Sequence, residues 1–234
     1  MNQITFPLLN LKLNISQIAF KIFGFEIYWY AVIIVTAIII AILVCKKNDG
    51  IHEIKFDTIL DIAIYLIPIS IISARIYYVL FNLSYYMQSP KSIFDLRSGG
   101  IAIYGGIIGG IITVIIYAKV KQLNFKDLLD YIAPALAIGQ SIGRWGNFIN
   151  VEAYGTETNL PWRMGLIEQG KYIEVHPTFL YESICTFIIF LILSKMQKNR
   201  KFKGQITATY LILYGIARAI IEYFRADSLM LRQI

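Results

Sequence analysis

Charged residues, histidine and cysteine are scarce in this sequence. Charged side chains make up 16% of the 234 residues, against roughly 25% in soluble domains. The two histidines and two cysteines form no HExxH or CxxC motif, and Cys45 and Cys185 both lie in apolar runs. No glycine-rich loop follows a strand-like segment. We therefore expect buried thiols, no catalytic metal and no nucleotide or other cofactor.

Apolar residues are abundant instead, at 57% of the chain with a mean hydropathy of +0.59. Six apolar segments approach the roughly 20 residues that a helix needs to cross a bilayer. Backbone groups in lipid must be bonded within the segment, so these runs predict helices rather than strands. We predict an all-α, polytopic membrane helix bundle that forms one domain over residues 1–234. The predicted helices cover residues 27–45, 57–83, 100–118, 128–148, 177–195 and 206–225.

Basic residues gather in short loops between these segments and account for much of the net charge of +7. No nucleic-acid motif accompanies them, so we expect no nucleic-acid partner. Lys and Arg favour cytoplasmic loops, and the basic loops at 46–55, 119–126 and 195–203 therefore place the N-terminus outside. The same topology puts two longer segments on the outer face, an aromatic arm at 84–99 and a polar cap at 149–176.

Three arginines, Arg75, Arg144 and Arg218, lie inside the apolar segments. Each costs roughly 2.5–3.5 kcal/mol at the centre of a membrane helix, so its presence needs a reason. Counting along each helix at about 1.5 Å per residue puts all three in the outer half of the bilayer. Further polar residues fall at a similar depth, namely Tyr30, Tyr104, His176 and Glu182. This common depth predicts a site that faces the outer leaflet, although His176 is equally compatible with a loop or cap role.

The densest polar cluster follows Arg144, with Asn147, Asn150 and Glu152 in the next eight positions. An arginine near a helix end can simply extend its charge to the interface, but these neighbours favour a fixed geometry. A planar guanidinium can hold two phosphate oxygens at once, so an arginine at headgroup depth suits a phospholipid phosphodiester.

The last apolar segment carries a second charged face. Arg218 and Glu222 are four residues apart, the spacing of an ion pair along a helix, and Tyr214 lies one turn earlier. The pair either neutralises itself or supplies a second cation to the site.

Three motifs, taken in chain order, resemble those of the bacterial prolipoprotein diacylglyceryl transferases. They are Gly99-Gly100-x-x-x-Tyr104-Gly105-Gly106, then Gly143-Arg144-x-Gly146-Asn147-Phe148-x-Asn150-x-Glu152-x-x-Gly155, and last His176-Pro177-Thr178-x-Leu180-Tyr181-Glu182. The resemblance implies a multi-pass enzyme of the bacterial cell membrane that takes phosphatidylglycerol and a preprolipoprotein as substrates. It would move the sn-1,2-diacylglyceryl group onto the lipobox cysteine thiol and release glycerol 1-phosphate.

The resemblance also implies roles for the polar residues. Arg144 and Arg218 would bind the phosphate and stabilise its growing charge. The remaining site residues would orient the arginines or line the substrate site: Tyr30, Arg75, Asn147, Asn150, Glu152, Gly155, His176, Tyr214 and Glu222.

The chain departs from the family pattern in two places. Many members have histidine before the Gly105-Gly106 pair, where this chain has Tyr104. A cysteine thiol with a pKa of about 8.5 needs a base or a positive field, so we expect Tyr104 to donate a hydrogen bond and the arginines to supply the field. The family also usually has seven membrane helices, whereas six are predicted here.

Glycines spaced as GxxxG, such as Gly105 with Gly109 and Gly139 with Gly143, predict close helix packing. Packing of the third segment on the fourth would bring Tyr104 beside Arg144. The letters of residues 139–143 also match a GxSxG nucleophile motif, but that motif needs a strand, a turn and a helix, and we expect a helix here.

The same arginines are also compatible with a second class of function, in which the protein binds a ligand but catalyses no reaction. A transporter or lipid-binding membrane protein would hold an anionic headgroup and would place polar residues in both halves of the bilayer. A metal-dependent phosphatidyltransferase would need an acidic cluster, whereas the aspartates between residues 57 and 130 are scattered at cytoplasmic ends. The outer-half concentration of polar residues favours a leaflet-facing enzyme.

Overall fold

The computed structural model describes residues 2–95 and 99–226. The chain divides into two compact units, one of residues 1–47 and 130–234 and one of residues 48–129. The boundary falls inside a long helix, α5 (Phe125–Asn150). Each unit is described by itself.

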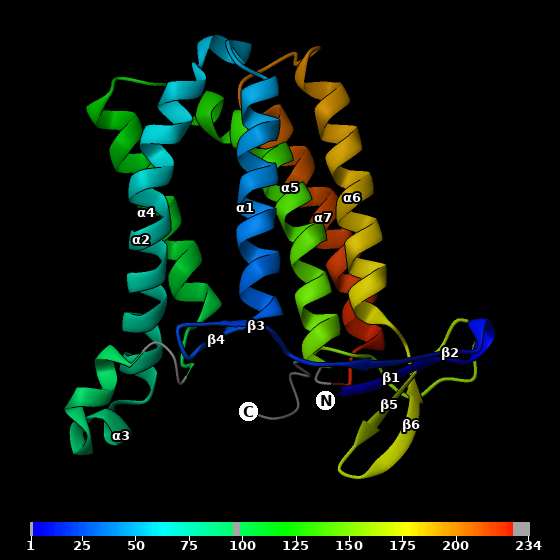
Figure 1. Cartoon of the computed structure of the whole chain (residues 1–234). Coiled ribbons are helices and arrows are strands. Elements are labelled where there is room, and N and C mark those ends of the chain that lie inside the picture. Colours follow the sequence, from blue (N-terminus) through cyan, green and yellow to red (C-terminus); the bar gives the residue numbers. More distant parts are fainter. Residues whose placement is uncertain (1, 96–98, 227–234) are drawn as a thin grey trace. The chain divides into compact units, whose positions relative to one another are not determined.

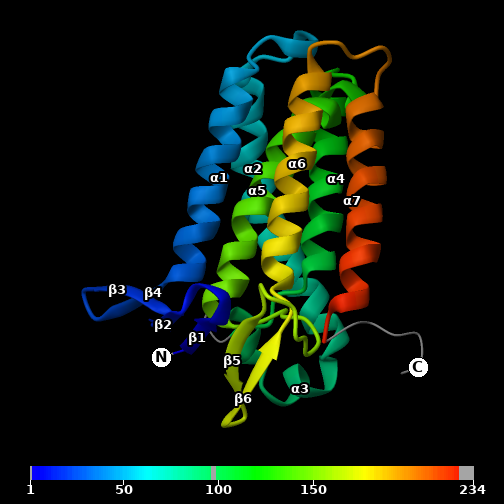
Figure 2. The same cartoon turned by 90° about the vertical axis from the view of Figure 1, so that its right-hand side faces the viewer.

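The first unit is built on four long helices. Besides most of α5 it contains α1 (Trp29–Lys47), α6 (Thr178–Gln197) and α7 (Gln205–Phe224). Figures 1 and 2 show α5, α6 and α7 running side by side. Small residues on α5, Ala133 and Ala137, let the larger Ile189, Leu193 and Ile206 pack closely in one buried cluster.

Buried polar side chains fix the register of these helices. Ser141 on α5 and Ser183 on α6 each donate to the other's backbone carbonyl, both at 2.8 Å. Ser141 thus links α5 to α6. It lies inside α5, so residues 139–143 form part of a helix, as predicted, and not the strand–turn–helix of a nucleophile elbow. At the other end of α5, Asp130 is 0% exposed. It accepts hydrogen bonds from the Thr207 and Gly204 amides at 2.8 Å and from Arg200 at 3.1 Å, which ties the start of α7 to α5.

A four-stranded antiparallel sheet crosses one end of α5 and α6 (Figure 1). Its strand order is β2-β1-β5-β6. Ile4 pairs with Leu13 on one side and Leu166 on the other, and it packs with Phe148 and Phe179 at the ends of the helices. The strands are β1 (Asn2–Phe6), β2 (Leu11–Ile15), β5 (Met164–Glu168) and β6 (Lys171–Val175).

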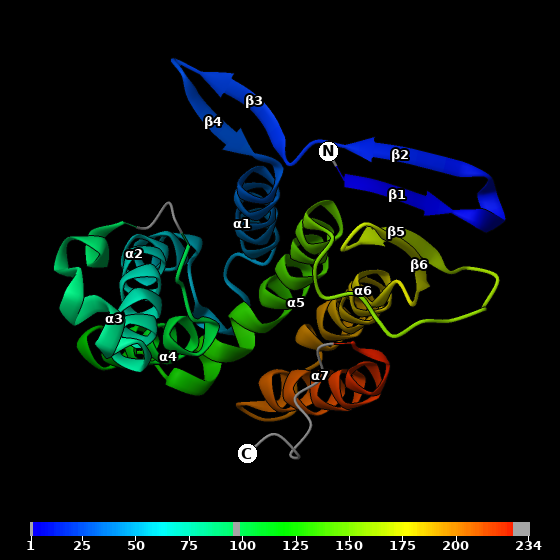
Figure 3. The ribbon, with the colours of Figure 1, turned by 90° about the horizontal axis from the view of Figure 1, so that it is seen from below.

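A separate hairpin of β3 (Ile18–Ile22) and β4 (Phe25–Tyr28) leads directly into α1. Its pairing sets Phe20 opposite Ile27 and Lys21 opposite Glu26, so one face is apolar and the other carries an ion pair. Figure 3 shows it projecting sideways from the end of α1.

These strands correct the all-α prediction. The strands have four or five residues each, far below the length of a membrane segment. The pairing of β1 with β5 also joins residues more than 150 positions apart, which a hydropathy pattern along the chain does not reveal.

The second unit contains α2 (Phe56–Phe81), the short α3 (Leu83–Gln88) and α4 (Ile103–Val120), with 3-10 turns at Ile51–Glu53 and Pro90–Phe94. A Cβ on Gly105 would lie 2.5 Å from the Ser73 carbonyl of α2, and one on Gly109 would lie 2.5 Å from the Ser73 Cβ. The expected close packing is therefore confirmed for this glycine pair, with α2 as the neighbour. It is wrong for Gly139 and Gly143, where an added Cβ would meet nothing within 4 Å and only Ile34 at 3.8 Å, respectively. Packing of α4 on α5, which would bring Tyr104 beside Arg144, stays a prediction.

Five helices among the described residues are long and apolar enough to cross a membrane: α1, α2, α4, α6 and α7. The protein is mostly helical, and these five match five of the six predicted segments. Helix α5 has 26 residues and spans about 39 Å at 1.5 Å per residue, but its polar and charged residues lower its mean hydropathy.

The predicted arm at 84–99 includes residues 96–98, which lie outside the described residues.

Candidate functional site

A buried carboxylate joins three helices at the end of the first unit that carries the sheet. Glu182, in the second turn of α6, is 3% exposed. Its Oε1 accepts from Arg144 of α5, in a short ion pair, and from the Tyr214 hydroxyl of α7 at 3.3 Å. Its Oε2 faces Arg218 of α7 at 3.4 Å. One carboxylate therefore sets the positions of both predicted phosphate-binding arginines.

The two arginines keep part of their hydrogen-bonding capacity. A guanidinium has five N–H groups. Arg144 directs one to Glu182 and one to the Asn147 amide oxygen at 3.1 Å. Arg218 directs one to Glu182 and forms an ion pair with Glu222. The others have no acceptor among the described residues. With side chains 23% and 31% exposed, respectively, both arginines can take an anionic ligand.

The turn after α5 extends this network. Asn147 donates to Glu152 Oε1 at 2.8 Å, and Asn150 approaches the same oxygen at 3.5 Å. The Glu152 amide bonds back to the Asn147 carbonyl at 3.0 Å. Val151 adopts a positive φ of 55° in this turn, a strained conformation for a β-branched residue. The strain accompanies a turn that folds Glu152 back over the helix end.

Tyr30 and Gly146 account for a close approach between α1 and α5. A Cβ on Gly146 would lie 2.7 Å from the Tyr30 ring, so glycine is required for the ring to rest against α5 within one turn of Arg144. This contact places Tyr30 at the level of the arginine cluster.

Gly155 and His176 hold the cap against α7. The Gly155 amide donates to the His176 carbonyl at 2.9 Å, and a Cβ there would lie 2.7 Å from the Phe224 carbonyl. The His176 ring faces the Tyr181 hydroxyl at 3.2 Å and packs on the Phe224 ring. Burial lowers the pKa of His176 below its usual 6.5 because the charged imidazolium loses hydration.

Arg75 has a different environment from the other two arginines. It is 6% exposed, and all five of its N–H groups have backbone carbonyl acceptors. Three of these bonds go to Ile93, Gly99 and Gly100 at 2.8–2.9 Å, and the other two go to Ser92 and Asp95. The charge therefore anchors the segment after α3, and a ligand at Arg75 would have to displace these bonds.

The structure thus brings most of the predicted site residues into one network. Seven of them lie together in the first unit: Arg144, Asn147, Asn150, Glu152, Tyr214, Arg218 and Glu222. Tyr104, in the first turn of α4, and Arg75 belong to the second unit. Glu182 was predicted to lie at the depth of the site, but no role in the site was assigned to it. An acidic residue within an apolar segment, at the end of the third motif, was the available signal.

Comparisons with known proteins show similarity along most of the chain. A family model described as "Prolipoprotein diacylglyceryl transferase" matches residues 17–234. The chain is 50% identical over 215 residues to a protein of Finegoldia magna, covering 92% of this chain and 85% of that protein. It is 49% identical over 216 residues to one of Clostridioides difficile, covering 92% and 86%. Both relatives carry the name phosphatidylglycerol–prolipoprotein diacylglyceryl transferase. With its five membrane-length helices, the chain is a multi-pass membrane protein and belongs to the prolipoprotein diacylglyceryl transferase family.

Proposed function

We propose that this protein transfers the sn-1,2-diacylglyceryl group of phosphatidylglycerol to the lipobox cysteine of a preprolipoprotein. The products are a thioether-linked prolipoprotein and glycerol 1-phosphate, the first step of bacterial lipoprotein maturation. The site of action is the outer leaflet of the bacterial plasma membrane.

One observation carries this proposal: Arg144 and Arg218 share the buried Glu182 and still have N–H donors to offer. The cysteine sulfur forms a C–S bond with the glyceryl carbon while the C–O bond to phosphate breaks. The electron pair leaves on the phosphate oxygen, so the departing monoester gains a second negative charge. Preorganised donors aimed at such a charge are worth about 2.7–4 kcal/mol each.

The thiol loses its proton to water as the thiolate forms, and the phosphate monoester departs as a dianion. Two guanidinium groups near the sulfur stabilise the thiolate and lower the thiol's pKa. Tyr104 donates a hydrogen bond to the reacting groups, in the place where many family members have histidine. Full activity in a Tyr104→Phe variant would remove this residue from the mechanism.

The other polar residues position these groups. Asn147, Asn150 and Glu152 orient Arg144 or the glycerol hydroxyls, and Glu222 orients Arg218. Four further residues line or shape the site: Tyr30, Tyr214, Gly155 and His176. Arg75 contributes by holding the arm carbonyls rather than by binding phosphate directly.

The membrane arrangement follows from the same reasoning. With helix α5 added to the five membrane-length helices, the single transferase domain has six spans, and the N-terminus lies outside. The pairing of β1 with β5 supports this topology because it joins the N-terminal strand to the cap at 149–176. The cap and the arm at 84–99 lie on the outer face. Six spans are proposed for this chain, whereas the family usually has seven.

The test uses purified protein in detergent with phosphatidylglycerol and a peptide that contains a lipobox cysteine. Glycerol 1-phosphate release and the peptide mass are measured together. Arg144→Ala should abolish transfer, while Arg163→Ala is the matched control because Arg163 pairs with Glu174 in the cap. A mass gain that requires both the peptide cysteine and Arg144 supports the transferase. Lipid binding without release by wild-type protein supports the transporter or lipid-binding alternative.

A further inference from the structure

An amide side chain lies one helical turn from the arginine cluster, on the side away from the sheet. Gln140 precedes Arg144 by four residues on α5, which corresponds to about 6 Å along the helix axis. Residues 132–139, just before it, are all apolar or glycine. In the proposed topology this stretch crosses the membrane, where a polar group without a partner costs free energy. Gln140 therefore needs a reason, as the arginines do.

Tyr210 of α7 satisfies the oxygen of this amide. Its hydroxyl donates to Gln140 Oε1 at 2.9 Å. The Tyr210 ring stacks on the Tyr214 ring, with centroids 5.7 Å apart and an interplanar angle of 8°, and Tyr214 in turn donates to Glu182. The stacked tyrosines thus hold the amide at a fixed place relative to the carboxylate that positions both arginines.

The nitrogen of the same amide has a different environment. A glutamine amide offers two donors besides its acceptor, and Gln140 Nε2 has no acceptor among the described residues. A glutamine that served only to join helices would use its donors across the interface as well. The side chain is partly exposed, and within the first unit a Cβ on Gly139 would meet no atom within 4 Å. This turn of α5 therefore has room for an acceptor that the first unit does not supply.

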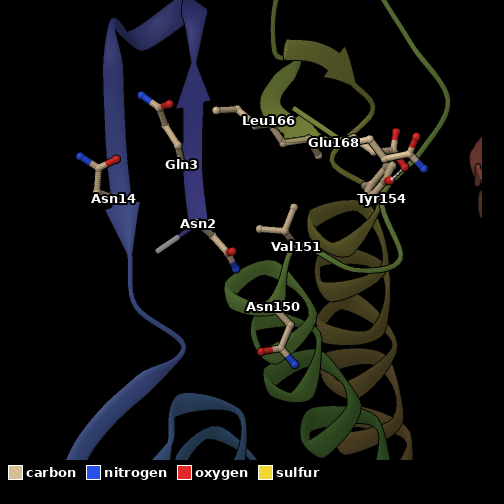
Figure 4. Close-up of a pocket in the computed structure, with 10 residues that line it drawn as sticks. Asn2, Gln3, Asn14, Asn150, Val151, Tyr154, Leu166 and Glu168 are labelled. Carbon is tan, nitrogen blue, oxygen red and sulfur yellow. Dashed lines mark hydrogen bonds between the residues drawn. The ribbon is translucent and has the colours of Figure 1, made fainter. Parts of the chain in front are cut away.

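The polarity along α5 sets the orientation of a lipid at the arginines. Beyond Arg144, toward the sheet, Asn150 and Glu168 present an amide and a carboxylate (Figure 4). In the other direction, α5 packs with α6 and α7 in an apolar cluster. A phospholipid whose phosphate lies at the arginines therefore directs its headgroup toward the sheet and its acyl chains away from it. The ester carbonyls, which join the chains to the glycerol, then follow the phosphate on the side of Gln140.

We propose that Gln140 donates a hydrogen bond to an ester carbonyl of the diacylglyceryl group. The inference rests on the proposed transferase function and deepens it, because it names a second part of the lipid that the site recognises. Tyr210 is a positioning residue, since it holds the amide oxygen and leaves the N–H groups for the lipid. The site then selects a diester lipid over one whose chains are joined by ether links, because an ether has no carbonyl to accept the bond.

The test compares phosphatidylglycerol with its dialkyl ether analogue, in which a methylene group replaces each ester carbonyl. Both lipids keep the glyceryl carbon and the phosphate that react, so the mass gain of the acceptor peptide gives a KM for each. One neutral hydrogen bond should make the wild-type KM roughly three- to tenfold lower for the ester lipid. Gln140→Leu/Tyr210→Phe should have equal KM values for the two lipids. Replacing both partners by apolar groups leaves no polar atom unpaired, so this variant should fold.

A matched control removes another polar pair of α5. Ser141 and Ser183 join α5 to α6 by hydrogen bonds within the protein. Ser141→Ala/Ser183→Ala should therefore keep the wild-type ratio of the two KM values. Because each variant is judged by a ratio, a general loss of activity does not imitate the expected result.

The outcomes separate this inference from the proposed function. Equal KM values for the two lipids in wild-type protein would overturn the inference without any variant, while the transferase function would stand. The inference also fails if Gln140→Leu/Tyr210→Phe keeps the wild-type preference, or if only the KM for the acceptor peptide rises, which would assign the amide to the peptide. If wild-type protein transfers neither lipid, the transferase function fails and the inference fails with it.

Discussion

Replacing the buried Glu182 with glutamine tests the central claim about the site. Glu182→Gln keeps the shape of the side chain but removes the charge that faces Arg144 and Arg218. Breaking a buried ion pair by removing one partner costs about 3–5 kcal/mol. We expect the lower end, about 3 kcal/mol, because the arginine side chains are 23% and 31% exposed and water screens them partly.

Activity should fall as well, because both arginines lose the acceptor that aligns them. A misplacement of about 1 Å in a catalytic group can cost roughly a hundredfold in rate, and we expect a loss of that order in kcat/KM. Denaturant unfolding in detergent and the glycerol 1-phosphate assay measure the two effects. Glu174→Gln is the matched control, since Glu174 pairs with Arg163 at the partly exposed cap surface. If Glu182→Gln behaves like this control in both assays, Glu182 does not organise the site.

Three further predictions concern the supports around the site. Asp130→Ala should lower the free energy of unfolding by about 3–5 kcal/mol, measured by denaturant unfolding, because it removes the fully buried acceptor of Arg200 and of the first turn of α7; an unchanged midpoint would contradict this. His176 has a lowered folded pKa, so its contribution to stability is present above pH 6.5 and is lost as pH falls from 6.5 through the folded value. Unfolding at pH 7.5 and 5.5 should show this loss in wild-type protein and a smaller one in His176→Gln. Arg75→Lys removes two of five donors, and a cost of about 2 kcal/mol should speed proteolysis of the segment at 83–95 roughly thirtyfold; equal cleavage rates would refute the anchoring role.

Some of the site could be predicted without coordinates because the signal is local. Arg144, Asn147, Asn150 and Glu152 lie within nine residues and contact one another in the structure. Helical spacing likewise placed Arg218 beside Glu222. Interactions within one turn or one helix depend on short-range geometry, which the order of residues already specifies.

Other features depend on residues that are distant in the chain. The carbonyls that bind Arg75 come from residues 17 to 25 positions later, so its charge alone could not distinguish a phosphate ligand from a backbone anchor. The pairing of β1 with β5 joins residues more than 150 positions apart, so the order of residues does not reveal it. The β3–β4 and β5–β6 hairpins pair locally and were not predicted because the search was for membrane-length apolar segments.

By itself the sequence determined that this is a helical membrane protein with cations in its apolar segments, because hydropathy and charge are properties of each segment. The sequence also determined the family, because each of the three motifs is one short, continuous stretch of residues. Only the tertiary structure decided which acceptor each arginine has. Glu182 sits on a third helix, 38 positions from Arg144 and 36 from Arg218. Because partners so far apart meet only when the helices pack, the shared carboxylate appears only in the folded molecule.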